Sequence, residues 1–339
     1  MKTIEEKIAI EKYESKAFDM YFGNKEIAVF DIETTGLFPG HEKIILTGIL
    51  LISDGECKAI QYFADKPDDE KQLVSKTIDT LKDIDVIITY NGRSFDMPFL
   101  KKRAEKLGVP MEIDAYDLDL YAILSGYSGL KGALNSLSQK SIEHYMGFSD
   151  NREDEINGYE SIRLYEQYMA SKSFALENKI LLHNHDDIIQ LYRIMPVLAN
   201  ADLHRAAFHL GFPAGNFMIS KCKITTGELL VTGHINGESA QDYISFPTES
   251  RPYSLMINAS NKNFELTIPA EHIEDSVIID ASKLLCGGGD QSIEDFDLDR
   301  YPSFESGYLI LKDKYMINYL EVNVFIIKFM KVLSKELNY

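Results

Sequence analysis

The chain has 339 residues, which exceeds the usual size of one hydrophobic core and favours two domains. Its 45% hydrophobic and 26% charged residues are typical of a soluble globular protein and argue against a fibrous or disordered chain. The net charge of −18 argues against binding over a long stretch of duplex nucleic acid, which needs clustered Lys and Arg. Binding of strand ends or of short single strands remains possible, because these need few phosphate contacts.

The part of the chain before residue 200 alternates between strand and helix signals. Residues 1–24 indicate a short, charged helical lead-in without the apolar core of a signal peptide. Apolar runs then predict five strands, at 26–31, 44–52, 57–63, 86–90 and 113–118. Helical periodicity follows the third and fourth strands and dominates residues 119–199. Three adjacent strands followed by helix, strand, helix and strand predict an α/β domain over residues 25–200.

Residues 201–339 have a different character. Alternating apolar runs between 217 and 279 are separated by Gly, Asn and Pro, as in an antiparallel sheet. The apolar window 316–333 is interrupted by Asn, Glu and Lys, which favours an amphipathic packing helix over a membrane span. We therefore expect a smaller β-rich domain with a C-terminal helix, which could position substrate, bind a protein partner or support a dimer. The three cysteines lack paired spacing for zinc or disulfides and indicate free buried thiols in a reducing cytoplasm. With no membrane span expected, we expect no membrane partner.

Two carboxylates stand at the end of the first predicted strand. Asp31 and Glu33 are two residues apart, so both side chains point to one face of a strand. Two ionised carboxylates held close together repel each other, and binding of a hard divalent cation such as Mg²⁺ or Mn²⁺ compensates this repulsion. Spacing alone is weak evidence, because about eight acid-x-acid pairs are expected by chance in so acidic a chain. This pair is nevertheless a candidate metal-binding pair, because an apolar strand precedes it and a Thr-Thr-Gly turn follows it.

Asp96 is the second candidate ligand, since it follows the predicted strand 86–90 at the start of a helix. An Asp two residues before Pro98 is also a good helix N-cap, and both readings stay open on this segment alone. Nearby, Asn91 can hydrogen-bond a backbone group or a substrate phosphate, and Phe95 offers an apolar wedge for a base.

The third candidate lies in a predicted helix from 174 to 195. His183 and Asp187 are four residues apart and share one helical face, although one such His–acid pair is expected by chance. On a helical wheel Asp187 falls inside the apolar arc, where a carboxylate requires compensation, whereas Asp186 falls outside it and can be solvated. His185 also falls within the arc and is interpreted as a satisfied core histidine. Asp187 is therefore the expected ligand.

Together, Asp31, Glu33, Asp96 and Asp187 could hold two divalent cations that clamp the attacking and leaving oxygens of a phosphoryl displacement. His183, with an ordinary pKa near ~6.5, is suited to take a proton from the attacking water.

Three ordered motifs carry a family resemblance: Phe30–Leu37 (FDIETTGL), Tyr90–Leu100 (YNGRSFDMPFL) and His183–Asp187 (HNHDD). Over residues 20–198 the chain resembles the RNase H-like DEDD exonucleases. The middle motif looks like those of family B polymerase proofreading domains and of the bacterial YprB-like predicted exonucleases. The His-Asn start of the third motif, and the helical segment before it, favour the YprB-like group.

The resemblance implies a five-stranded RNase H-like mixed sheet flanked by helices, two Mg²⁺ or Mn²⁺ ions and hydrolysis from a 3′ end. By the same match the four carboxylates are the metal ligands. The expected substrate contacts are Thr34, Thr35, Gly36, Leu37, Asn91 and Phe95. Relatives with the four-residue spacing of the third motif often carry Tyr in place of His, and relatives with His usually have one residue more, so the role of His183 as general base stays open.

The leading hypothesis is a two-metal-ion-dependent 3′–5′ exonuclease acting on single-stranded or short DNA or RNA. The alternative is a catalytically weak nuclease-fold module that binds nucleic acid or a protein partner. A third reading takes the acids as caps and solvated residues of an unrelated α/β enzyme.

Overall fold

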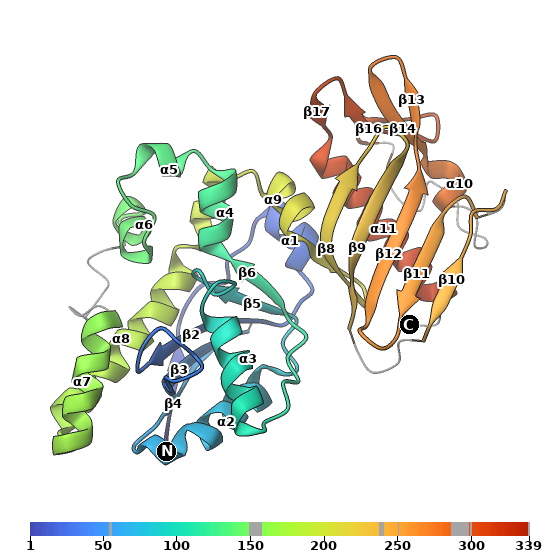
Figure 1. Cartoon of the computed structure of the whole chain (residues 1–339). Coiled ribbons are helices and arrows are strands. Elements are labelled where there is room, and N and C mark those ends of the chain that lie inside the picture. The colour runs from blue at the N-terminus through green and yellow to red at the C-terminus, as the bar shows by residue number, and fades with distance from the viewer. Residues whose placement is uncertain are drawn as a thin grey trace. The chain divides into compact units, whose positions relative to one another are not determined.

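The computed structural model describes residues 1–53, 56–148, 158–236, 241–249, 251–285, 298 and 300–337. The chain forms two compact units, Met1–Asp202 and Leu203–Tyr339 (Figure 1). This division lies two residues after the boundary that the sequence indicates.

Unit 1 is built on a mixed six-stranded sheet in the order β1-β4-β3-β2-β5-β6. Its strands are β1 (Lys2–Ile8), β2 (Ile27–Thr34), β3 (Ile44–Ile52), β4 (Cys57–Phe63), β5 (Val86–Thr89) and β6 (Tyr116–Asp119). The central strand β2 pairs antiparallel with β3 and parallel with β5, and β5 pairs parallel with β6. The predicted α/β class with a mixed sheet is confirmed, and all five strands expected from the apolar runs are present.

The sixth strand corrects the sequence interpretation of residues 1–24. Residues 2–8 do not form a helical lead-in but a strand, which pairs antiparallel with β4 from Lys2↔Phe63 to Ile8↔Cys57. Helix α1 (Lys16–Phe22) begins only after Ser15, whose side chain accepts a hydrogen bond from the backbone N–H of Phe18. Ile4 and Ile8 are four residues apart among charged neighbours, so a half-covered edge strand has the apolar spacing of a short helix.

Helices cover both faces of this sheet (Figure 1). The described helices are α1, α2 (Glu70–Leu81), α3 (Asp96–Leu107), α4 (Leu120–Tyr127), α5 (Leu130–Ala133), α6 (Gln139–Tyr145), α7 (Gly158–Ser171) and α8 (Phe174–Arg193), with 3-10 turns at Pro67–Asp69 and Met195–Asn200. On one face α2 and α3 bury Leu73 and Phe99 in a cluster with Phe30 of β2. On the other face α7 and α8 bury Tyr168 and Ile180 against Phe63 of β4.

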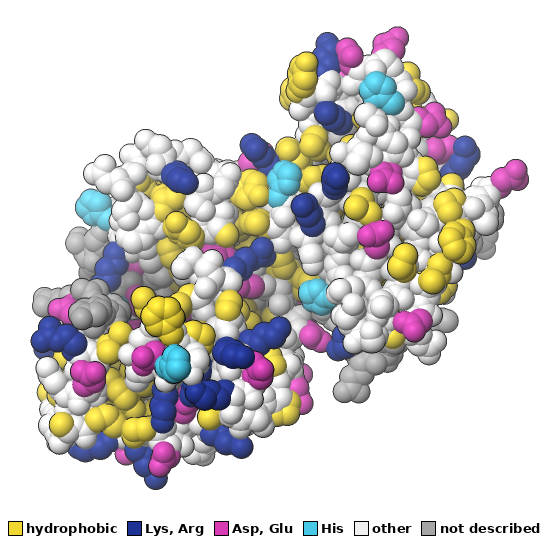
Figure 2. Space-filling model, viewed as in Figure 1, with side chains coloured by type: hydrophobic (Ala, Val, Ile, Leu, Met, Phe, Trp, Pro, Cys, Tyr) yellow, Lys and Arg dark blue, Asp and Glu magenta, His cyan; other side chains and the backbone are white. Residues whose placement is uncertain are grey.

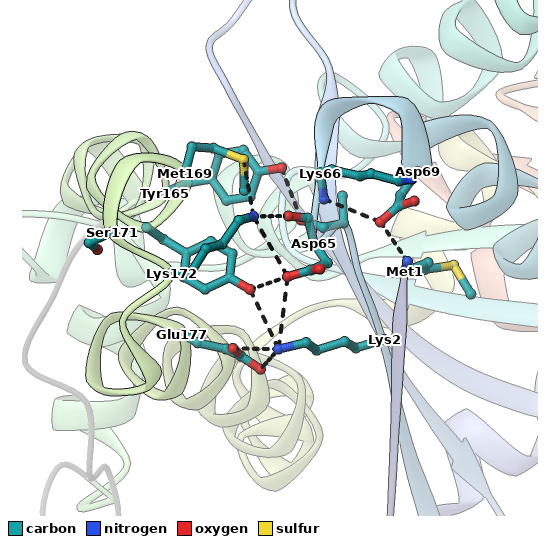
Figure 3. A network of polar contacts seen from close by, with 12 residues as sticks. Met1, Lys2, Asp65, Lys66, Asp69, Tyr165, Met169, Ser171, Lys172 and Glu177 are labelled. Carbon is teal, nitrogen blue, oxygen red and sulfur yellow. Dashed lines mark hydrogen bonds and ion pairs between the residues drawn. The ribbon is translucent and has the colours of Figure 1, made fainter.

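A polar network fastens the sheet edge to α7 and α8 (Figure 3). Lys2 of β1 lies 2.6 Å from a carboxylate oxygen of Glu177 on α8. Tyr168 of α7 donates a hydrogen bond to Asp65, just after β4, and the Lys172 ammonium group lies 3.7 Å from the same carboxylate. These contacts help to fix α8, the helix that carries the third motif.

Unit 2 is β-rich, as predicted. One antiparallel sheet has the order β10 (Tyr243–Ser245), β11 (Ser254–Asn258), β12 (Asn263–Pro269), β9 (Glu228–Ile235), β8 (Phe217–Ile224), β7 (Phe212–Ala214). A second has the order β13 (Glu271–Ile273), β14 (Ser276–Asp280), β16 (Tyr308–Asp313), β15 (Phe304–Glu305), with β17 (Met316–Ile317) paired to β16. Its helices are α9 (Leu203–Leu210), α10 (Ala281–Leu285) and α11 (Tyr319–Glu336).

The C-terminal helix α11 buries Val322, Phe325, Ile326, Phe329 and Leu333, which follow the spacing of one helical face. The amphipathic packing helix expected from the sequence is therefore confirmed. Within the described ranges, no helix has the length and apolar character needed to cross a membrane. Cys57 and Cys222 are free and buried, and Cys286 lies outside the described residues.

Candidate active site

Four carboxylates from three separate segments face one pocket of about 920 Å³. Asp31 and Glu33 come from β2, Asp96 from the start of α3 and Asp187 from α8. The pocket is also lined by every other residue that the sequence singled out for the site: Thr34, Thr35, Gly36, Leu37, Asn91, Phe95 and His183. The fold therefore brings the three motifs together, at the point where β2 extends beyond its pairing with β5.

Asp31 lies buried among the other acidic groups of the pocket. Burial raises the pKa of Asp31 well above its usual value, and the negative charges of Asp187, Asp96 and Glu33 raise it further. A hydrogen bond from Asn184 acts in the opposite direction. Acidic groups that repel one another in a desolvated pocket keep protons unless a cation takes their place.

Asp96 does not act as a helix cap. It is the first residue of α3, and the preceding cap position, Phe95, makes no side-chain cap hydrogen bond. Instead, Asp96 Oδ1 accepts a hydrogen bond of 3.1 Å from the backbone N–H of Ile32, between the two acids of the first motif. Burial raises the pKa of Asp96 to about 7. The side chain thus joins α3 to β2 beyond Val29, the last residue of β2 that pairs with β5.

On α8, His183 lies between two of the carboxylates. Its Nε2 atom is 3.5 Å from Glu33 Oε1 and 3.5 Å from Asp187 Oδ2, and its side chain is 4% exposed. Ligand atoms of these three residues all lie within 4.8 Å of one another, a spacing at which they could hold one metal ion. The donors are mostly carboxylate oxygens, which suits Mg²⁺ or Mn²⁺, and Asp31 and Asp96 add two further oxygen donors to the pocket.

The helical wheel was wrong about the neighbours of Asp187. Asp186 is buried, with 8% of its side chain exposed, whereas Asp187 is 18% exposed because it faces the open pocket. His185 is a partly exposed side chain 3.4 Å from Glu6 of β1, not a core histidine. This side of α8 faces β1, a strand that the sequence did not reveal, and residues of both elements line one pocket.

The sequence also did not single out several residues that shape the pocket. Asp119, the N-cap of α4, accepts a hydrogen bond of 2.8 Å from the backbone N–H of Asn91, whose φ of 66° is a left-handed conformation that Asn tolerates. Gln139 of α6 donates a hydrogen bond of 3.0 Å to the backbone oxygen of Asp187. Lys140 is the one Lys or Arg among the described residues that line the pocket. Of these residues only Asp119 could have been identified from the sequence, because an Asp directly before a helix is a typical N-cap.

An exposed apolar loop forms part of the pocket rim. Leu37 is 70% and Phe38 72% exposed. The loop is nevertheless anchored to α3, because Arg103 donates a hydrogen bond of 3.1 Å to Pro39 O and Lys106 one of 2.7 Å to Gly40 O. Figure 2 shows Lys and Arg side chains gathered over α3, beside hydrophobic side chains of this loop. Positively charged side chains thus lie beside this part of the pocket rim.

The mixed sheet, with acidic residues gathered at the end of its central strand, defines unit 1 as an α/β domain with an RNase H-like fold. A family model described as the RNase_H superfamily matches residues 28–199, about half of the chain, and the chain belongs to that superfamily. The resemblance noted in the sequence is confirmed at this level, while the place within the YprB-like group stays a prediction.

The chain is similar to parts of several archaeal DNA polymerases. One from Methanocaldococcus jannaschii is 34% identical over 110 residues, which are 31% of this chain and 6% of the polymerase. One from Pyrococcus glycovorans is 36% identical over 104 residues, 27% of this chain and 13% of the polymerase. The chain therefore corresponds to only a small part of these relatives. A family B DNA polymerase structure from Pyrobaculum calidifontis aligns with a TM-score of 0.42 and 16% identity, over 91% of this chain and 46% of that chain.

Proposed function

We propose that the protein is a metal-dependent 3′–5′ exonuclease that acts on single-stranded or short nucleic acid. The observation that carries the proposal is the meeting of Asp31, Glu33, Asp96 and Asp187 in one pocket, with His183 between two of them. Membership of the RNase H superfamily and similarity to part of several DNA polymerases support it.

The four carboxylates would hold two Mg²⁺ or Mn²⁺ ions. When bound, such ions stabilise negative charge on the phosphate and lower the pKa of water. The raised pKa values of Asp31 and Asp96 fit this role, since a bound cation relieves the burial and mutual repulsion that disfavour their ionised forms. The hydrogen bond from Ile32 N to Asp96 fixes this carboxylate beside the Asp31–Glu33 strand, and Gln139 fixes the backbone at Asp187.

His183 is the proposed proton acceptor from the attacking water. It is the one His among the described residues that line the pocket, and its Nε2 atom faces Glu33 and Asp187 at 3.5 Å. The nearby carboxylates would stabilise the imidazolium that forms when it takes the proton.

The rim indicates how a short single strand is held. The exposed Leu37 side chain offers an apolar surface against which an unpaired base can pack, and Phe95 offers an aromatic ring inside the pocket on which a base can stack. Lys140 can contact a phosphate, and Asn91 can hydrogen-bond one. With so few cationic contacts, the expected footprint is a few nucleotides and the expected salt dependence is shallow.

The test is a cleavage assay with 5′-labelled single-stranded DNA and RNA oligonucleotides in Mn²⁺. We expect a ladder that shortens from the 3′ end, which a 3′-phosphate block slows. Asp31→Asn should lower the rate by about 10³-fold or more, because it removes one ligand charge, whereas the exposed Asp79→Asn should leave it unchanged. Intact oligonucleotides with the wild-type protein would overturn the proposal and favour a catalytically weak binding module.

A further inference from the structure

Asn184, the residue after His183, lies over a row of three residues on adjacent strands. Asp31 of β2 is opposite Gly48 of β3, and Gly48 is opposite Gln61 of β4. Asn184 is fully buried at 0% exposure, and Gln61 is 4% exposed. A polar side chain so completely removed from water requires partners for its donors and acceptors.

Both ends of the Asn184 amide have such partners. Its Nδ2 atom donates a hydrogen bond of 2.8 Å to Asp31 Oδ2, and its Oδ1 atom accepts one of 2.8 Å from Gln61 Nε2. Gln61 Nε2 also donates a hydrogen bond of 2.9 Å to the backbone oxygen of Leu181. Because a carbonyl oxygen can only accept, Leu181 sets the orientation of the Gln61 amide. Gln61 in turn presents N–H to Asn184 and so directs the Asn184 N–H towards Asp31.

The sheet is also shaped around this amide. A Cβ atom at Gly48 would lie 2.3 Å from Asn184 Oδ1, well inside van der Waals contact. Any larger residue at position 48 would therefore displace Asn184 from the row. Glycine is required here for close approach of a side chain and not for an unusual backbone angle.

We propose that Asn184 is a positioning residue for Asp31, set by Gln61 and accommodated by Gly48. This inference rests on the proposed function, because it concerns how the metal site is prepared. The bond to Oδ2 holds the Asp31 carboxylate in one orientation and leaves Oδ1 for a metal ion. Asn184 lies between His183 and Asp187 on α8, so one helical turn both supplies groups to the pocket and orients the carboxylate on β2.

Calorimetric titration of the full-length protein with Mn²⁺ tests the proposal. Asn184→Asp is nearly isosteric but cannot donate when ionised, and Asn184→Leu removes the amide. Both should weaken Mn²⁺ binding by about 10- to 100-fold, the usual effect of losing a partner that orients a metal ligand. Gln190→Leu is the matched control, because Gln190 is an equally buried amide on the same helix that does not line the pocket. It should bind Mn²⁺ as the wild type does.

Gly48→Ala gives a second test, which does not depend on whether the Asn184 variants fold. Gly48→Ala changes no polar group, yet it should weaken Mn²⁺ binding by a similar factor by displacing Asn184. Circular dichroism and thermal melting show which variants are folded. If the wild type binds Mn²⁺ and cleaves, but folded Asn184→Asp and Gly48→Ala bind Mn²⁺ within twofold of it, the positioning role is overturned. If the wild type neither binds Mn²⁺ nor cleaves, it is the proposed function that fails.

Discussion

Unit 1 and unit 2 each contain a six-stranded sheet, but they bury different kinds of side chain. Among the described residues of unit 2, the buried polar side chains are Ser303 and Asn323, and neither is charged. The buried charged residues of unit 1 are Glu33, Asp69, Glu70, Asp96, Arg103, Asp119, Glu143, Glu177 and Asp186. Both units thus fold around apolar side chains, but among the described residues only those of unit 1 include buried charged side chains.

Some of the buried charges in unit 1 are neutralised within the protein. Arg103 of α3 forms a doubly hydrogen-bonded pair with Glu70, and both side chains are less than 5% exposed. Glu33 and Asp96 instead face further carboxylates, an arrangement that costs stability without a cation. The difference between the units indicates that the acidic pocket of unit 1 is built at a cost in stability. Four predictions test this, from the largest expected effect to the smallest.

The largest effect is expected at the pocket itself. Glu33→Gln should lower the rate of Mn²⁺-dependent cleavage by about 10³-fold, because the metal site loses a ligand charge. Glu265→Gln is the matched control on β12 of unit 2, where the side chain is exposed, and it should leave the rate unchanged. Single-turnover kinetics on a labelled oligonucleotide measure both. Equal losses in the two variants would contradict the assignment of the site to unit 1.

Breaking the buried ion pair of unit 1 should cost almost as much free energy. Arg103→Met leaves Glu70 charged and without its guanidinium partner, so the free energy of unfolding should fall by about 3–5 kcal/mol. Urea denaturation measures it. The double variant Arg103→Met/Glu70→Gln removes the stranded charge and should recover most of the loss. A double variant as unstable as the single one would show that the pair contributes packing and not charge compensation.

The core of unit 2 should behave as ordinary apolar packing. Leu266 of β12 is fully buried, and Leu266→Ala should lower the free energy of unfolding by about 2–5 kcal/mol through lost burial and a residual cavity. The Mn²⁺ affinity of the folded protein should stay at the wild-type value. Calorimetric titration below the melting temperature measures it, and a weakened metal site would mean that unit 2 contributes to the pocket.

The smallest effect is a pH dependence of the metal-free protein. Burial raises the pKa of Asp96 to about 7. Between pH 4 and pH 7 the folded state therefore keeps a proton on Asp96 that the unfolded state has already released. Stability from this group is therefore greatest at low pH and is lost as the pH rises through 7. The wild type should gain about 1.4 kcal/mol, or 3–5 °C in melting temperature, between pH 8 and pH 6.

Asp96→Asn is the control for that measurement and should remove this part of the gain. Saturating Mn²⁺ should reverse the trend, since the cation binds the deprotonated carboxylate and protons compete with it. Differential scanning calorimetry with and without chelator follows both. A melting temperature of metal-free wild type that rises with pH over this range would contradict the raised pKa.

Local patterns in the sequence were sufficient where the chemistry is local. Strand alternation placed Asp31 and Glu33 on one face, and helical spacing placed His183 beside Asp187; both pairs line the pocket. The five expected strands of unit 1 and the β-rich character of unit 2 followed from runs of apolar residues. These features depend on backbone periods of two and 3.6 residues, which a sequence displays directly.

Contacts between distant segments were not accessible in the same way. The edge strand β1 faces α8 through Glu6 and His185, and no period within α8 indicates a strand contributed from the other end of the domain. The role of Asp96 was ambiguous for the same reason, since its hydrogen-bond partner Ile32 is 64 residues away. Asn184 carried no signal beyond its place in a motif.

The sequence by itself thus determined which acids could form a site and which faces they occupy. Tertiary structure alone decided that Asp96 bonds to β2, that Asp186 is buried, and that Gly48 leaves room for the amide that orients Asp31. The physical reason is that residue type and period fix the direction of a side chain, whereas its burial and partners depend on whichever element packs against it.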